Sequence, residues 1–140
     1  MIELNYELAQ KVLDAALAKS KALGLSMNVA VVDAGSNLTA FARQDGAWLG
    51  SIDIAMAKAR TARYFDMPTE QLGVLAQPGQ PLFGIEVTNG GLVTFAGGVP
   101  LTIDGRVIGA IGVSGSTVEN DQEVALAGQG ELSRIPSLTT

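Results

Sequence analysis

The stretch GGVPLTIDGRVIGAIGVSGS, residues 97–116, decides the fold. Asp104 and Gly105 are the preferred pair for a tight two-residue hairpin turn, and an apolar run lies on each side of them. The second run is apolar on both of its alternating faces, Val107, Gly109, Ile111 and Val113 on one and Ile108, Ala110 and Gly112 on the other. Such a strand is covered on both sides. The stretch therefore predicts a hairpin whose second strand is central in a sheet.

The rest of the chain supplies a second hairpin and three helices. Residues 25–43 contain two β-rich runs joined by the turn residues 33–37. Helical spacing predicts a helix over Tyr6–Leu23, capped by Asn5, and another over Ile52–Phe65, capped by Ser51. The S-x-x-E spacing of Ser116 and Glu119 resembles a capping box and predicts a last helix to about Ala127, stopped by Gly128.

Between and beyond these elements the sequence is less regular. Residues 76–91 hold two prolines and four glycines, which predicts an extended loop with one short strand around Phe83–Val87. No internal repeat is visible. We expect one domain over residues 1–130 and a flexible tail over residues 131–140.

Composition excludes several classes of function. The 140 residues carry nine Lys and Arg against fourteen Asp and Glu, and the basic residues are scattered, which argues against nucleic-acid binding. The amino terminus lacks the features of a signal peptide, and no apolar stretch approaches the roughly 18 residues of a membrane span. We expect a cytoplasmic protein that does not bind membranes.

The sequence contains no cysteine and no histidine. Thiolate nucleophiles, disulfides, Ser-His-Asp triads and ordinary zinc sites are therefore excluded, and no metal site is expected. Any acid or base must be Asp, Glu, Lys or Tyr.

Several loops are expected to meet at one end of the sheet, namely residues 43–47, 77–81, 96–100 and 114–117. Gly97, Gly98 and Gly115 would let backbone N–H groups approach an anionic ligand there. Arg43 or Lys58 would hold the anion, with Asp45 and Gly46 in the same turn and Trp48 beside it. Ordinary tight turns, a solvated ion pair and plain packing of Trp48 explain the same residues equally well.

The chain resembles the GlcG/HbpS-like family of small haem-degrading or haem-binding-related proteins, a domain also found at the carboxyl terminus of PduO-type proteins. The resemblance is carried by VAVVDAGSNLTAFARQDGA (29–47), KARTA (58–62), GGVPLTIDGRVIGAIGVSG (97–115) and DQEVALAG (121–128). It implies an α/β (α+β) fold, a profilin-like sandwich with a central antiparallel sheet of about five strands and three main helices. It also implies a homo-oligomer, as a dimer, tetramer or octamer.

Carried over position by position, the family cleft would comprise Arg43, Asp45, Gly46, Lys58, Gly97, Gly98, Pro100, Ser114, Gly115 and Asp121. The loop reasoning adds Trp48 and Ser116. The cofactor is unknown. If haem binds, histidine cannot ligate its iron, and Tyr, Met, Lys or a hydroxyl would have to do so.

Three functions stay open at this point. The first is a small-ligand-binding accessory protein of a catabolic pathway, which holds haem, another tetrapyrrole or a small organic acid in a glycine-lined cleft. The second is a cofactor-independent isomerase, tautomerase or hydrolase acting on an oxo acid, with Lys58 or Asp45 as the catalytic proton-transfer group. The third is a purely structural role in assembly.

Overall fold

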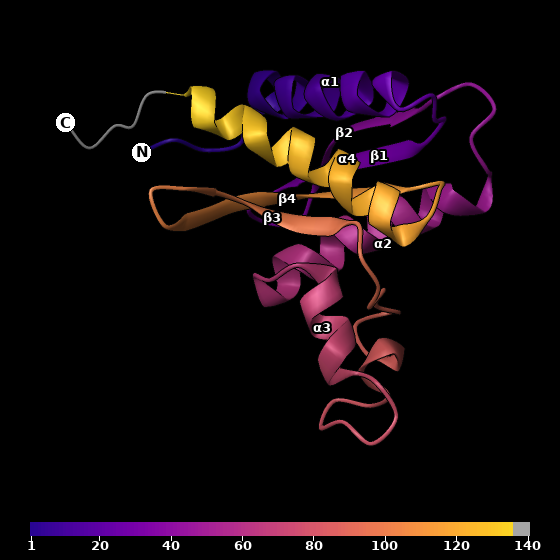
Figure 1. Cartoon of the computed structure of the whole chain (residues 1–140). Coiled ribbons are helices and arrows are strands. Elements are labelled where there is room, and N and C mark those ends of the chain that lie inside the picture. The colour runs from indigo at the N-terminus through magenta and orange to yellow at the C-terminus, as the bar shows by residue number, and fades with distance from the viewer. Residues whose placement is uncertain (136–140) are drawn as a thin grey trace.

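A four-stranded antiparallel sheet lies between helices on its two faces (Figure 1). The computed structural model describes residues 1–135 of the chain. The strands are β1 (Asn28–Asp33), β2 (Leu38–Arg43), β3 (Gly98–Ile103) and β4 (Arg106–Ser114), in the order β2-β1-β4-β3. Both predicted hairpins and the central position of the second strand of 97–116 are confirmed, but the sheet has four strands rather than about five.

The turn between β3 and β4 has the conformation that its residues favour. Asp104 and Gly105 both have positive φ, 53° and 76°. Two such residues give the turn a twist that matches that of the flanking strands.

Four α-helices pack around the sheet, where three were expected. α1 (Tyr6–Ala22) and α4 (Val118–Gly130) cover one face, and α2 (Gly50–Phe65) covers the other, with α3 (Thr69–Leu75) beyond it (Figure 1). The predicted cap of α1 is confirmed, because the Asn5 side chain accepts a hydrogen bond from the Leu8 N–H at 2.9 Å. None of the helices among residues 1–135 is both long and apolar enough to cross a membrane.

The two faces of the sheet carry different cores. The α1 and α4 side buries large aliphatic residues such as Val12, Ile111 and Val124. The α2 side is built almost entirely from alanine, including Ala55, Ala59 and Ala62. Small side chains bring α2 close to the sheet, and this close approach places its lysine at the sheet end.

Two predicted helix starts differ from the structure. Ser51 lies inside α2, since Leu49 already has helical φ and ψ. The cap of α4 is Thr117, whose side chain accepts from the Asn120 N–H at 3.1 Å. The capping-box prediction was wrong because the Ser116 N–H donates to Asp121 and its hydroxyl accepts from the Asn120 side chain.

The predicted stop of the last helix at Gly128 was also wrong. A side chain at that position would meet Ile111 Cδ1 at 2.5 Å, so the glycine permits close packing inside α4 rather than ending it. A short 3-10 helix, η2 (Glu131–Arg134), follows directly, so the expected tail is structured over its first four residues. The remainder of that tail, residues 136–140, lies outside the described residues.

α3 and the segment after it project away from the sheet (Figure 1). The strand expected around Phe83–Val87 is instead a 3-10 helix, η1 (Ile85–Val87). Gly84, with φ 92°, turns the chain just before it, which breaks the extended conformation that a strand needs. We call α3 and residues 76–96 the arm.

Candidate functional site

A fully buried lysine lies at one end of the sheet. Lys58, on the inner side of α2, has 0% of its surface exposed. Its Nζ donates to the Val113 carbonyl and to Asp121 Oδ2, each at 2.8 Å, and lies 5.0 Å from the centre of the Phe95 ring. The side chain therefore joins strand β4 to two helices, α2 and α4, that lie on opposite faces of the sheet.

Glycines make room for this ion pair. A Cβ on Gly97 would stand 2.5 Å from both Lys58 Nζ and the Val113 oxygen, and Gly97 has φ 127°, which disfavours other residues. A Cβ on Gly98 would stand 2.5 Å from the Lys58 carbonyl oxygen. The backbone around these glycines thus encloses the protein's own ammonium group.

Asp121 is held from the other side by the start of α4. It is only 2% exposed, and its Oδ1 accepts from the Ser116 N–H at 3.1 Å. The loop between β4 and α4 therefore fixes the carboxylate that faces Lys58.

Burial shifts the pKa of both partners. Desolvation lowers the pKa of the Lys58 amine, while the hydrogen bond and the charge of Asp121 raise it. Desolvation raises the pKa of Asp121, while Lys58 and the N–H groups of Ser116 and Gly115 lower it. Desolvation is the larger cause for both groups, so the pKa of Lys58 lies below its ordinary value and that of Asp121 above it, and the contact between the two side chains opposes both shifts.

The predicted site residues fall into two groups. Lys58, Gly97, Gly98, Ser114, Gly115, Ser116 and Asp121 gather around the buried pair. Pro100 lies further along β3, opposite Ala110, and its carbonyl accepts from Gln129.

The second group lies at the same end of the sheet, two strands away. Arg43 and Ser114 both pair with Asn28, one on each side of β1. The Arg43 guanidinium donates to the Ala47 carbonyl at 3.1 and 2.7 Å, so it closes the turn that holds Asp45 and Gly46. Asp45 is exposed, and within residues 1–135 it forms no hydrogen bond or ion pair with Lys58. The ligand-binding role of both groups stays a prediction.

Trp48 and the expected 77–81 loop lie apart from the buried pair. Trp48 is 67% exposed, although its carbonyl accepts from the Asn28 side chain at 3.0 Å. Residues 77–81 follow α3 into the arm, away from the end of the sheet (Figure 1). Gly97, Gly98 and Gly115 therefore do not line a common cleft with that loop.

Sequence reasoning missed Phe95 and Asn28. Phe95 covers Lys58 Nζ and lines a hollow of about 360 Å³ between α3 and the start of α4. Asn28 is 0% exposed, and its Oδ1 has no hydrogen-bond partner among the described residues. The polar Asn28 at the start of an apolar run was the available signal, since buried amides are normally paired.

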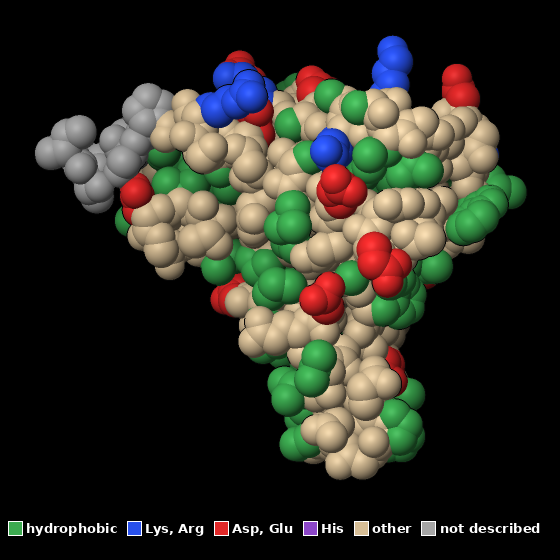
Figure 2. Space-filling model, in the orientation of Figure 1, with side chains coloured by type: hydrophobic (Ala, Val, Ile, Leu, Met, Phe, Trp, Pro, Cys, Tyr) green, Lys and Arg blue, Asp and Glu red, His purple; other side chains and the backbone are tan. Residues whose placement is uncertain are grey.

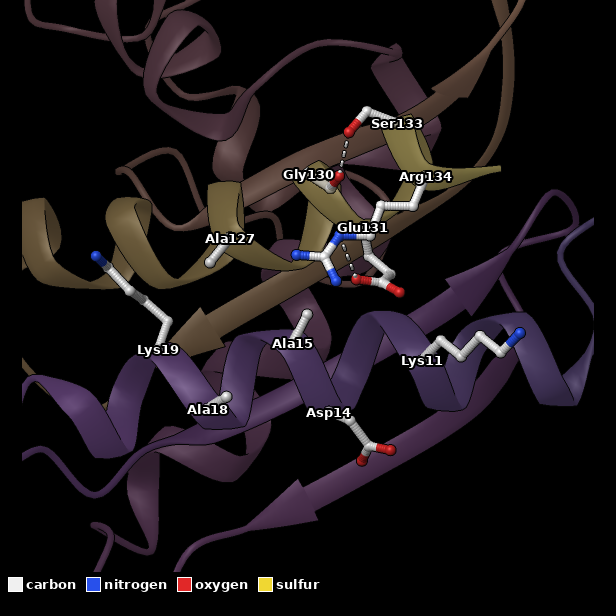
Figure 3. Close-up of a pocket in the computed structure, with 10 residues that line it drawn as sticks. All are labelled: Lys11, Asp14, Ala15, Ala18, Lys19, Ala127, Gly130, Glu131, Ser133 and Arg134. Atoms are coloured by element: carbon white, nitrogen blue, oxygen red, sulfur yellow. Dashed lines mark hydrogen bonds and ion pairs between the residues drawn. The ribbon is translucent and has the colours of Figure 1, made fainter. Parts of the chain in front are cut away.

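A larger groove of about 750 Å³ lies between α1, α4 and η2 (Figure 3). Ala15, Ala18 and Ala127 form its floor, and Lys11, Lys19 and Arg134 stand around it. Within residues 1–135 no group of three or more acidic side chains is placed to hold a metal ion.

The fold and the buried pair define a small α+β sandwich protein whose sheet end is closed by its own lysine and aspartate. The family model of the haem degrading protein HbpS-like matches residues 4–129. The chain belongs to this HbpS-like family, as the sequence resemblance predicted.

Individual relatives agree with this assignment. A 15.0 kDa protein of the dhaT-dhaS intergenic region of Citrobacter freundii is 40% identical over 118 residues, 84% of this chain and 83% of the relative. The crystal structure of Klebsiella pneumoniae protein ORFY superposes with a TM-score of 0.92 at 33% identity, covering 97% of this chain and 95% of that one. The PduOC:Heme complex superposes with a TM-score of 0.88 at 34% identity, covering 93% and 95%.

Proposed function

We propose that this chain is an accessory protein that binds a tetrapyrrole. The observation that carries the proposal is its similarity, over 93% of its length, to a protein whose structure is a haem complex. A groove of about 750 Å³ is within the range of about 300–1,000 Å³ that is usual for small-molecule sites.

The residues of this chain do not fit a centre that ligates haem iron. Histidine and cysteine are absent from the sequence. Within residues 1–135, no methionine or tyrosine lines either of the two hollows described above: Met27 is enclosed in the core, and Tyr6 and Tyr64 are 66% and 46% exposed elsewhere.

Titration of the full chain tests this function. Haem added to the protein is expected to bind with a Kd of about 10 µM or tighter, equivalent to about −7 kcal/mol, measured by absorbance and by calorimetry. Short carboxylates such as glycolate serve as controls and are expected to bind far more weakly, because they lack the apolar ring. Absence of tetrapyrrole binding below millimolar concentration would defeat the proposal.

We further propose that the arm joins copies of this chain into a homo-oligomer. Residues 71–96 contain a single charged residue, Glu86. The arm exposes Val74, Phe83 and Val87 at 64%, 66% and 86%, and Figure 2 shows apolar side chains gathered on this projection. Apolar surface that is gathered in one place favours a protein interface, and a symmetric copy of the same surface is the simplest partner.

A charge placed on the arm is expected to dissociate the oligomer. Phe83→Asp combined with Val87→Asp would put two carboxylates into the contact, and light scattering should show a smaller particle. Leu126→Asp, at a 45% exposed apolar position on α4, is the matched control and should leave the mass unchanged. A parent protein that is already monomeric at high concentration would contradict this assignment.

A further inference from the structure

We propose that the groove between α1 and α4 is the tetrapyrrole site, and that it holds a flat dicarboxylate ligand whether or not the ligand carries iron. This inference rests on the function proposed above. It adds the place, the contacts and the independence from metal.

The shape of the groove suits a flat ring. Ala15 and Ala18 on α1 face Ala127 and Gly130 on α4, and the Glu131 and Arg134 side chains of η2 reach over the space between the helices (Figure 3). At the carboxyl end of α4 the groove is closed by η2, which contributes Ser133 and Arg134. With Arg134 turned from Glu131 to a carboxylate of the ligand, a planar apolar macrocycle could lie across the two helices with methyl groups beneath it.

Cations are concentrated around this groove, although the protein as a whole is acidic. Three of the nine Lys and Arg residues line it, in a chain whose net charge is −5. Five others are already committed to partners within the fold: Arg43, Lys58, Arg60, Arg63 and Arg106. Of the groove cations, Lys19 and Arg134 also form ion pairs, with Glu123 and Glu131, but both pairs are more exposed than that of Lys58.

The three cations are spaced along the groove. Lys11 and Lys19 are eight residues apart on α1, which separates them by about 12 Å along the helix axis. Arg134 approaches from η2 on the opposite side (Figure 3). A ligand with two carboxylates on flexible arms could reach two of these cations at once, which favours a dianion over a single carboxylate.

Two acidic residues also line the groove. Asp14 accepts a hydrogen bond from Gln10 at 3.0 Å, and its carboxylate points away from α4 (Figure 3). Glu131 lies 3.8 Å from Arg134, and Lys19 lies 3.3 Å from Glu123 outside the groove. Exposed pairs at such distances are worth about 0–1 kcal/mol, so a bound carboxylate can compete for both cations.

The groove lacks the side chains that usually ligate haem iron. Within the part of the chain that the structure describes, its lining includes no tyrosine or methionine. The two lysine side chains there are exposed or half-exposed, and the Ser133 hydroxyl donates to the Gly130 carbonyl at 2.7 Å. Removal of the iron should therefore cost little affinity.

The ligand test compares haem, iron-free protoporphyrin and the dimethyl ester of protoporphyrin with the full chain. Haem and protoporphyrin are expected to bind within about fivefold of each other, and the neutral ester at least about tenfold more weakly, because it loses the charge contacts. Absorbance and fluorescence quenching measure the three dissociation constants. If haem bound a hundredfold more tightly than protoporphyrin, iron would be ligated and this inference would be overturned while the proposed function stood.

The site test uses charge reversal. Lys11→Glu combined with Arg134→Glu is expected to weaken protoporphyrin binding at least about tenfold. Lys21→Glu, on the same helix but outside the groove lining, should change it less than about twofold. Ala18→Trp, which fills the groove from an exposed position, should also reduce binding, with circular dichroism to show that the fold is kept.

The outcomes separate the two claims. Unchanged affinity in both the charge-reversed and the Ala18→Trp variants would place the ligand elsewhere and overturn the groove assignment alone. Failure of the parent protein to bind any tetrapyrrole would remove the proposed function and this inference together.

Discussion

Replacing Lys58 by methionine is expected to lower the free energy of unfolding by about 3–5 kcal/mol, because it leaves the Asp121 carboxylate buried without its cation. Methionine keeps most of the length of the lysine chain, so the change removes charge more than volume. Urea denaturation followed by far-ultraviolet circular dichroism measures the loss. Lys21→Met, an exposed position in the last turn of α1, should change the stability by less than about 0.5 kcal/mol.

A double variant separates the charge from the packing. Lys58→Met combined with Asp121→Leu removes both charges and should recover most of the stability, because a buried ion pair and an apolar pair of similar volume are often nearly equivalent. A double variant as unstable as the single one would mean that the lysine stabilises the fold by packing, against our interpretation.

The loss in Lys58→Met should also depend on pH. Burial raises the pKa of Asp121, and the variant lacks the cation that opposes this rise. The folded state then holds a proton that the unfolded chain releases above the ordinary aspartate pKa of about 3.9. The stability that the protonated Asp121 carboxyl contributes in the variant is thus fully present below the unfolded pKa, and it is lost as the pH rises through the pKa of Asp121 in the folded state. The difference in the free energy of unfolding between the parent and the variant should therefore become smaller as the pH falls from 7 to 4.

Replacing Gly112 by alanine is expected to cost about 3 kcal/mol, at the upper end of the usual cost of overpacking. The new Cβ would collide with the Ala55 carbonyl oxygen and the Ala59 nitrogen, which are backbone atoms of α2 and cannot rotate away. The measurement is the midpoint of thermal or urea unfolding. Gly50→Ala is the matched control, because no atom stands within 4 Å of the new methyl group and φ is not positive, and it should be neutral or stabilising. Equal effects at the two positions would contradict the close contact of α2 with β4.

The hairpins could be predicted because their signals are local. Asp104 and Gly105 set the turn, and the apolar residues on both faces of 107–113 require a central strand wherever the rest of the chain goes. The α4 cap was missed for a tertiary reason, since Asp121 accepts from the Ser116 N–H and also pairs with Lys58, which comes from another helix. Gly128 was wrongly predicted to end the helix for a similar reason. It is a glycine because a side chain there would collide with Ile111 of β4, which lies 17 residues earlier in the sequence.

The candidate site shows the same division between local and tertiary signals. Glycine 97 could be recognised as a place where side-chain bulk is excluded, but the sequence does not say what occupies the space. The structure fills it with Lys58. The α1–α4 groove gave no motif at all, because its residues come from three separate turns of α1 and from the junction of α4 and η2.

The route of the Lys58 side chain has a consequence for how the molecule comes apart. In a sheet with two unequal cores, the helix over the alanine-lined core could detach first while the aliphatic core stays intact, which would give a partly unfolded intermediate. Here that separation would break the ion pair between Lys58 of α2 and Asp121 of α4, which lies on the other face of the sheet. The alanine-lined layer is therefore stabilised by its link to the aliphatic layer. Melting should accordingly proceed in a single step, with α2 and α4 lost together.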